Sequence, residues 1–69
     1  MEDVVKKISS ATKFAAQFRG EKEIPDKFIE EVSRECLDMD FDIKRYPNGM
    51  PSAKAVYEIA KSRHNASLN

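Results

Sequence analysis

The segment Arg45–Arg63, RYPNGMPSAKAVYEIAKSR, decides the fold because a turn and a long helical pattern meet in it. Pro47, Asn48 and Gly49 predict a turn, since glycine takes positive φ freely and asparagine tolerates it. The last helix is predicted to begin at Pro51 or Ser52. One of its faces carries Ala53, Val56, Ile59, Ala60 and Arg63, and the other carries Lys54, Tyr57, Glu58 and Lys61.

The residues just before this turn fit two structures. Alternation of Phe41 and Ile43 allows a short strand, whereas the spacing from Ile43 to Tyr46 allows one or two helical turns. We favour a short helix over residues 40–46.

Further back, a second helix is predicted over residues 25–38. Pro25 suits the first position of a helix, where its missing N–H costs nothing. The apolar side chains that recur at helical spacing are Phe28, Ile29, Val32, Cys36 and Leu37.

The N-terminal residues 1–19 predict a long amphipathic helix that ends before Gly20. Its core stripe is expected to consist of Val4, Ile8, Ala11, Phe14, Ala15 and Phe18. A second stripe of smaller side chains runs through Val5, Ser9, Thr12 and Ala16. This second stripe either flanks the core in partial contact with solvent or forms a close-packed dimer contact through Val5, Thr12 and Ala16.

These patterns predict an all-α fold, a small bundle of three to four helices in one domain that spans residues 1–69. The long N-terminal helix covers a trihelical, helix-turn-helix-like unit over residues 25–64, and residues 65–69 form a frayed tail. A chain of 69 residues buries a small core, so a homodimer is a reasonable expectation. The expected core residues of the trihelical unit are Phe28, Ile29, Val32, Leu37, Ile43, Val56 and Ile59.

Charge is balanced overall but unevenly distributed. The chain has 12 basic and 12 acidic residues. Residues 1–40 hold ten acidic and seven basic residues, whereas residues 41–69 hold five basic and two acidic residues. The C-terminal part could therefore face phosphate while the front part repels it.

The composition argues against an enzyme, a cofactor and a metal site. His64 and Cys36 are the only residues of their kinds, and the run DMDFD lacks the glycine and glutamate of a calcium loop. A single cysteine suits a reducing cytosol, so we expect a cytoplasmic protein. No apolar run approaches the roughly 20 residues of a membrane-spanning helix.

The turn and last helix favour double-stranded DNA as the partner. A recognition helix places polar and cationic side chains near its start against base edges, while neighbouring cations hold phosphates. The predicted DNA contacts are Lys44 and Arg45 before the turn and Ser52, Lys54, Tyr57 and Lys61 on the helix.

The run YPNGMPSAKAVYEIAK resembles the helix-turn-helix of phage small terminase subunits and related homeodomain-like proteins. The matching positions are Gly49, Met50, Pro51, Ser52, Val56 and Tyr57, whereas Glu58 and Ile59 depart from the basic and aromatic residues usual there. The resemblance implies DNA binding by a small phage-type or bacterial regulator.

A helical protein-interaction module, a small regulator or inhibitor, is the alternative. In that hypothesis the acidic second helix binds a protein partner. The residues expected to make this contact are Glu30, Glu31, Glu35 and Asp38.

Overall fold

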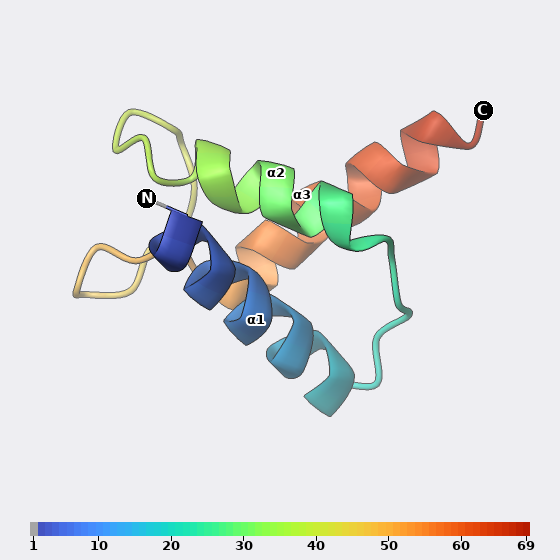
Figure 1. The fold of residues 1–69 in the computed structure, drawn as a ribbon, viewed down its shortest axis with the longest axis horizontal. Helices are drawn as coiled ribbons and strands as arrows, with labels where there is room; N and C mark the ends of the chain where they lie inside the picture. The colour runs from blue at the N-terminus through green and yellow to red at the C-terminus, as the bar shows by residue number, and fades with distance from the viewer. Residues whose placement is uncertain (1) are drawn as a thin grey trace.

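The computed structural model describes residues 2–69, and the fold over these residues is all-α. It contains three helices: α1 (Glu2–Phe18), α2 (Asp26–Glu35) and α3 (Ala53–Ser67). Each helix packs against the other two, with α3 crossing behind α1 and α2 in Figure 1. Within residues 2–69, none of these helices is long and apolar enough to cross a membrane.

The core lies where the three helices meet. Its buried side chains are Ile8, Ile29, Val32, Cys36, Val56 and Ala60. Phe28, Leu37, Ile43 and Ile59 pack around this centre and are partly buried. The core predicted for the second and last helices is therefore confirmed.

The prediction of which face of α1 enters the core is wrong. Of the predicted stripe, only Ile8 is fully buried. Phe14 and Phe18 are 71% and 85% exposed. The smaller stripe is buried instead, because α1 packs against both other helices and small side chains allow that close approach. Val5, Thr12 and Ala16 lie inside this interface with at most 5% exposure, so their predicted role as a dimer contact is also wrong.

Gly20 ends α1 as its sequence position predicts. Its φ is 74°, which glycine adopts without the penalty that a Cβ brings. The Gly20 N–H donates to the Gln17 carbonyl and the Glu21 N–H to the Ala16 carbonyl, at 3.0 and 2.9 Å. This pair of bonds is a Schellman motif, and it turns the chain toward α2.

The short helix predicted over residues 40–46 does not form, and α2 ends at Glu35 rather than near residue 38. The Asp38 carboxylate accepts a bond from the Asp40 N–H, and the Phe41 N–H donates to the Asp38 carbonyl. Aspartate side chains compete with helical bonding in this way, and Pro47 disfavours helical geometry at Tyr46.

Residues 45–51 form a tight hairpin, and the turn predicted at Pro47–Gly49 is confirmed. Arg45 and Pro51 form an isolated antiparallel bridge. The Gly49 N–H donates to the Tyr46 carbonyl and the Tyr46 N–H to the Met50 carbonyl, each at 2.8 Å. Gly49 supplies the positive φ of 87° that this three-residue loop requires. Thus a hairpin, and not a short helix, leads into α3.

The last helix continues to Ser67, so the tail predicted to fray at residue 65 remains helical for one further turn. The Ser67 hydroxyl donates to the His64 carbonyl at 2.7 Å, which satisfies one of the carbonyl groups left open at a helix end.

Candidate nucleic-acid interface

Two exposed lysines lie near the point where the hairpin joins α3. The Ser52 N–H donates to the Lys44 carbonyl at 2.9 Å, so the backbone of Lys44 lies beside the N-cap of α3. Lys44 and Lys54 are both exposed, and Ser52 is half-buried. Three of the predicted DNA contacts therefore lie together at the start of this helix.

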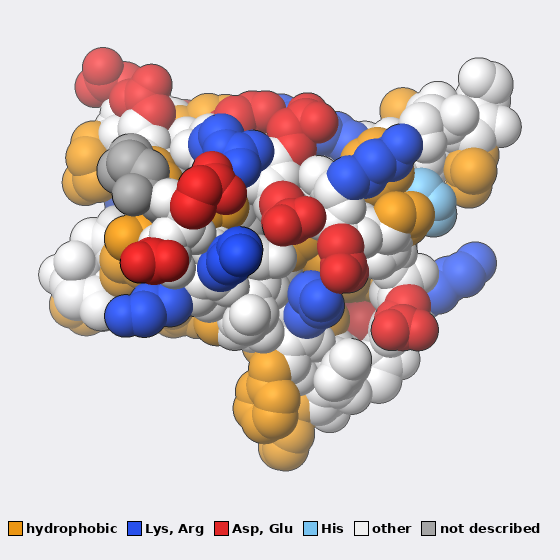
Figure 2. Space-filling view, viewed as in Figure 1, with side chains coloured by type: hydrophobic (Ala, Val, Ile, Leu, Met, Phe, Trp, Pro, Cys, Tyr) orange, Lys and Arg blue, Asp and Glu red, His pale blue; other side chains and the backbone are white. Residues whose placement is uncertain are grey.

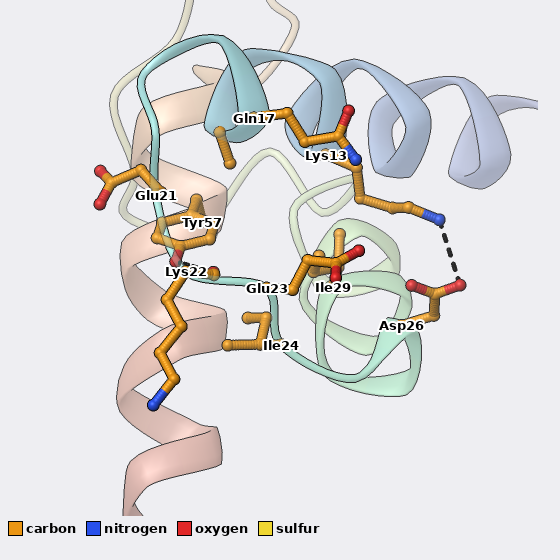
Figure 3. Close-up of a pocket in the computed structure, with 10 residues that line it drawn as sticks. Lys13, Gln17, Glu21, Lys22, Glu23, Ile24, Asp26, Ile29 and Tyr57 are labelled. Atoms are coloured by element: carbon orange, nitrogen blue, oxygen red, sulfur yellow. Dashed lines mark hydrogen bonds and ion pairs between the residues drawn. The ribbon is translucent and has the colours of Figure 1, made fainter.

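Tyr57, in contrast, points inward. Its side chain is 1% exposed and its hydroxyl donates to the Lys22 carbonyl (Figure 3). The Arg19 guanidinium lies 5.8 Å from the centre of the Tyr57 ring. The prediction that Tyr57 contacts DNA is wrong, because the ring anchors the α1–α2 linker to α3.

Four cationic residues border Tyr57, and Lys44 lies at the start of the same helix. Lys54 and Lys61 lie three residues before and four residues after Tyr57, so both are on its side of the helix. Arg19 places its guanidinium over the Tyr57 ring, and Lys22 is held beside Tyr57 through its backbone carbonyl. We call this set the α3 cation cluster: Arg19, Lys22, Lys44, Lys54 and Lys61.

Three carboxylates temper the charge of the cluster. Arg19 donates to Glu21 at 3.4 Å, and the exposed Glu58 lies four residues after Lys54 on α3. Glu23 is exposed beside Lys22 and lines the same hollow, so three carboxylates stand against five cations and the positive excess is small.

Arg45 stabilises the loop and is not free to contact a phosphate. Its guanidinium donates to the carbonyl oxygens of Gly49, Asp38 and Phe41, at 3.1, 2.9 and 3.4 Å. A side chain held by three carbonyls would have to give up these bonds to reach DNA. The prediction of Arg45 as a DNA contact does not fit this arrangement.

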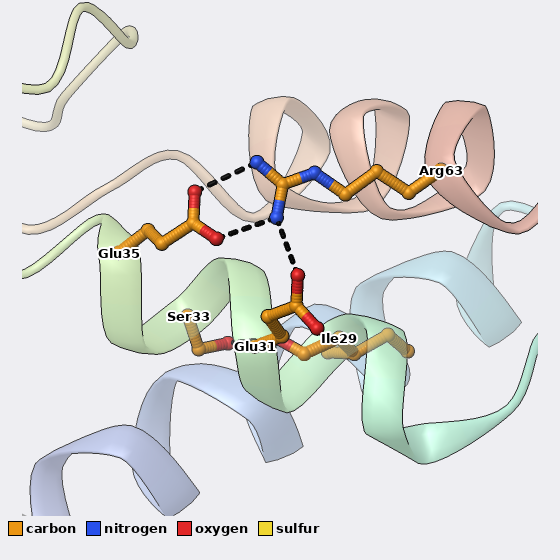
Figure 4. Close-up of polar contacts among 5 residues, drawn as sticks. All are labelled: Ile29, Glu31, Ser33, Glu35 and Arg63. Carbon is orange, nitrogen blue, oxygen red and sulfur yellow. Dashed lines mark hydrogen bonds and ion pairs between the residues drawn. The ribbon is translucent and has the colours of Figure 1, made fainter.

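The acidic side of α2 is largely occupied within the chain. Arg63 of α3 donates two bonds to the Glu35 carboxylate, at 2.6 and 2.7 Å, and one to Glu31 at 2.9 Å (Figure 4). Hydrogen bonding to Arg63 lowers the pKa of the Glu35 carboxyl, and bonding to Glu35 raises the pKa of Arg63. Glu30 is half-buried, and Asp38 is exposed while holding the Asp40 N–H.

A small hollow lies between α1, α2 and the linker (Figure 3). Lys13 and Asp26 pair across its rim at 3.1 Å. Its volume of about 30 Å³ accommodates a water molecule and not a substrate-sized ligand.

Comparison of the chain with known protein families, with curated proteins and with solved structures found no match. The sequence pointed to Lys44, Ser52, Lys54 and Lys61. It did not point to Arg19 and Lys22, because these residues reach α3 only through the burial of Tyr57.

Proposed function

We propose that the protein is a small DNA-binding regulator that holds the phosphate backbone of double-stranded DNA with the α3 cation cluster. The observation that carries this proposal is that Arg19, Lys22, Lys54 and Lys61 border Tyr57 on α3, while the backbone of Lys44 lies at the start of the same helix. Lysine and arginine contacts to phosphate supply most of the affinity of such complexes.

The start of α3 adds to the attraction for phosphate. Ser52 occupies the N-cap without a side-chain bond to the first turn, and Lys44 and Lys54 flank this position. Backbone N–H groups at a helix start and the positive end of the helix dipole favour anions. The Ala53 N–H is bonded to the Tyr46 hydroxyl at 3.2 Å, so a phosphate here would depend on the following N–H groups and on the two exposed lysines.

Backbone contact is favoured over base reading. Tyr57 is buried and Arg45 is bound to carbonyl groups, so two of the six side chains first expected to touch DNA are committed to the fold. Phosphate contacts fix the position of a protein on DNA but carry no sequence information themselves. We therefore expect binding with modest sequence preference.

The experiment compares Lys54→Glu with Lys6→Glu in a fluorescence anisotropy titration of mixed-sequence duplex DNA at low salt. Both lysines are exposed and the substitutions change net charge equally, but Lys6 lies on α1 near Glu2 and not on α3. Lys54→Glu is expected to weaken binding at least about tenfold, as loss of a contact and a new repulsion would do. Lys6→Glu should bind within about twofold of wild type.

Circular dichroism checks that both variants keep the helical content of the wild type. Equal affinity of Lys54→Glu and wild type, at unchanged helical content, would contradict the proposal.

The alternative function, protein binding through the acidic side of α2, has weaker support. Glu31 and Glu35 already neutralise Arg63, and Arg34 donates to Glu2 at 2.7 Å. A basic partner would have to compete with these intramolecular pairs.

A further inference from the structure

One face of α1 is apolar and turned away from the core. Val4, Ala11, Phe14 and Phe18 are all exposed along it, with the two phenylalanine side chains 71% and 85% exposed. Hydrophobic side chains project at the lower edge of Figure 2, where the later turns of α1 lie in Figure 1. Contiguous apolar surface of this kind marks an interaction site.

We propose that a second copy of this chain covers this face, with the two α1 helices packed antiparallel. Positions 4, 7, 11, 14 and 18 alternate in steps of three and four, which is the spacing of the seam between two packed helices. Ala11 lies near the middle of the seam, where a small side chain allows the helices to approach closely. A twofold axis near Ala11 places Val4 near the partner's Phe18.

The polar residues beside the seam select the antiparallel direction. Asp3, Ser10 and Gln17 repeat every seven residues along one edge and are exposed. In the antiparallel pair, Asp3 lies near the partner's Gln17, whose amide can donate to the carboxylate. A parallel pair would instead set the two Lys7 ammonium groups against each other on the seam.

Lys7, the one charged residue on the seam, is compatible with the antiparallel pair. It comes near the partner's Phe14, where the lysine stem covers the ring and the ammonium group can lie over its face. The antiparallel arrangement also sets the positive end of each helix dipole beside the negative end of the other.

The size of the face predicts a weak dimer. Aromatic side chains bury about 150–250 Å² each, so the four phenylalanines of a pair supply roughly 600–1,000 Å². A groove of about 250 Å³ beside the seam, lined in part by Tyr46 and Met50, offers further apolar surface. This total is near the lower limit for specific interfaces, so we expect dissociation in the micromolar range or weaker.

Sedimentation equilibrium up to about 1 mM protein, where such an interface is populated, tests the dimer. The wild-type mass should rise toward that of a dimer, and the double variant Phe14→Ala/Phe18→Ala should stay monomeric with at least about tenfold weaker association. Met39→Ala removes an exposed apolar side chain elsewhere and should associate like the wild type. A monomeric wild type, or association unchanged in the double variant, would overturn the proposal.

Cysteine cross-linking tests the direction of packing. In the antiparallel pair, the two Ala11 positions are close, whereas the two Val4 positions are separated by about 20 Å, from the 1.5 Å rise per residue. Ala11→Cys should therefore cross-link with a short thiol reagent, and Val4→Cys should not. Wild type, whose only cysteine is the buried Cys36, gives the background. Cross-linking of Val4→Cys at the yield of Ala11→Cys would indicate parallel packing and overturn the antiparallel arrangement.

Discussion

At the scale of single residues, Thr12 places a polar hydroxyl group in the close-packed interface of α1. The side chain is completely buried, and among the described residues its hydroxyl oxygen has no hydrogen-bond partner. Ser33 is also fully buried, but its hydroxyl donates to the Ile29 carbonyl at 2.6 Å. The two hydroxyls therefore differ in cost, because an unsatisfied buried polar group loses its hydration without compensation.

Thr12→Val keeps the shape of the side chain and removes the unsatisfied hydroxyl. We expect the free energy of unfolding to rise by about 1 kcal/mol, since the desolvation penalty disappears. Urea unfolding followed by circular dichroism measures the change. Ser33→Ala is the control, and loss of its hydrogen bond should lower stability by about 1 kcal/mol. A less stable Thr12→Val protein would show that the hydroxyl has a partner in solution.

At the scale of elements, periodicity in the sequence identified the three helices, but not all of their faces and ends. The stripe with the large aromatic side chains of α1 was predicted to be buried. In the structure the stripe with smaller side chains is buried instead, because α1 packs against two other helices. The helix predicted over residues 40–46 does not form, because the Asp38 side chain accepts a bond from the Asp40 N–H and Pro47 disfavours helical geometry at Tyr46. Both outcomes depend on contacts that spacing alone does not contain.

Sequence spacing also predicted only part of the candidate site, because spacing reports local pattern and not long-range contacts. Lys54 and Lys61 follow from the polar face of a helix, which is a local pattern. The approach of Lys22 depends on a hydrogen bond between residues 35 positions apart in the chain, so the sequence gives no local signal for it.

The ion pair between α2 and α3 makes stability depend on pH. Hydrogen bonds from Arg63 lower the pKa of Glu35 below its ordinary value of 4.5, so the folded state binds this proton less readily than the unfolded state. The pair therefore stabilises the protein above about pH 4.5, and this contribution is lost as the pH falls through the lowered pKa. Both groups are partly solvated, so the contribution should not exceed about 1 kcal/mol.

Glu35→Gln removes this contribution. We expect a lower free energy of unfolding near neutral pH, and a smaller difference from wild type in acid, where Glu35 is protonated in both states. Chemical unfolding at several pH values measures both. Glu23→Gln, at an exposed linker position, is the control and should match the wild type. A constant difference between Glu35→Gln and wild type across the acid range would contradict the assignment.

At the scale of the whole molecule, the net charge is zero, but positive and negative side chains lie on different surfaces. Glu31 and Glu35 of α2 are paired with Arg63, while the residues of the α3 cation cluster come from three segments. The α1 seam, if paired, would join two such clusters in one particle and increase the number of phosphates that it contacts. This arrangement suits a weak monomer that binds DNA more firmly as a dimer.

The most direct test of the central claim is the salt dependence of wild-type binding to mixed-sequence duplex DNA. Contact of one cluster with three to five phosphates predicts a log–log slope of affinity against salt of about −2.7 to −4.5, at roughly −0.9 per phosphate. Binding that weakens along such a slope would support the α3 cation cluster as a phosphate-binding surface. Absence of binding at low salt, or affinity that does not change with salt, would contradict it.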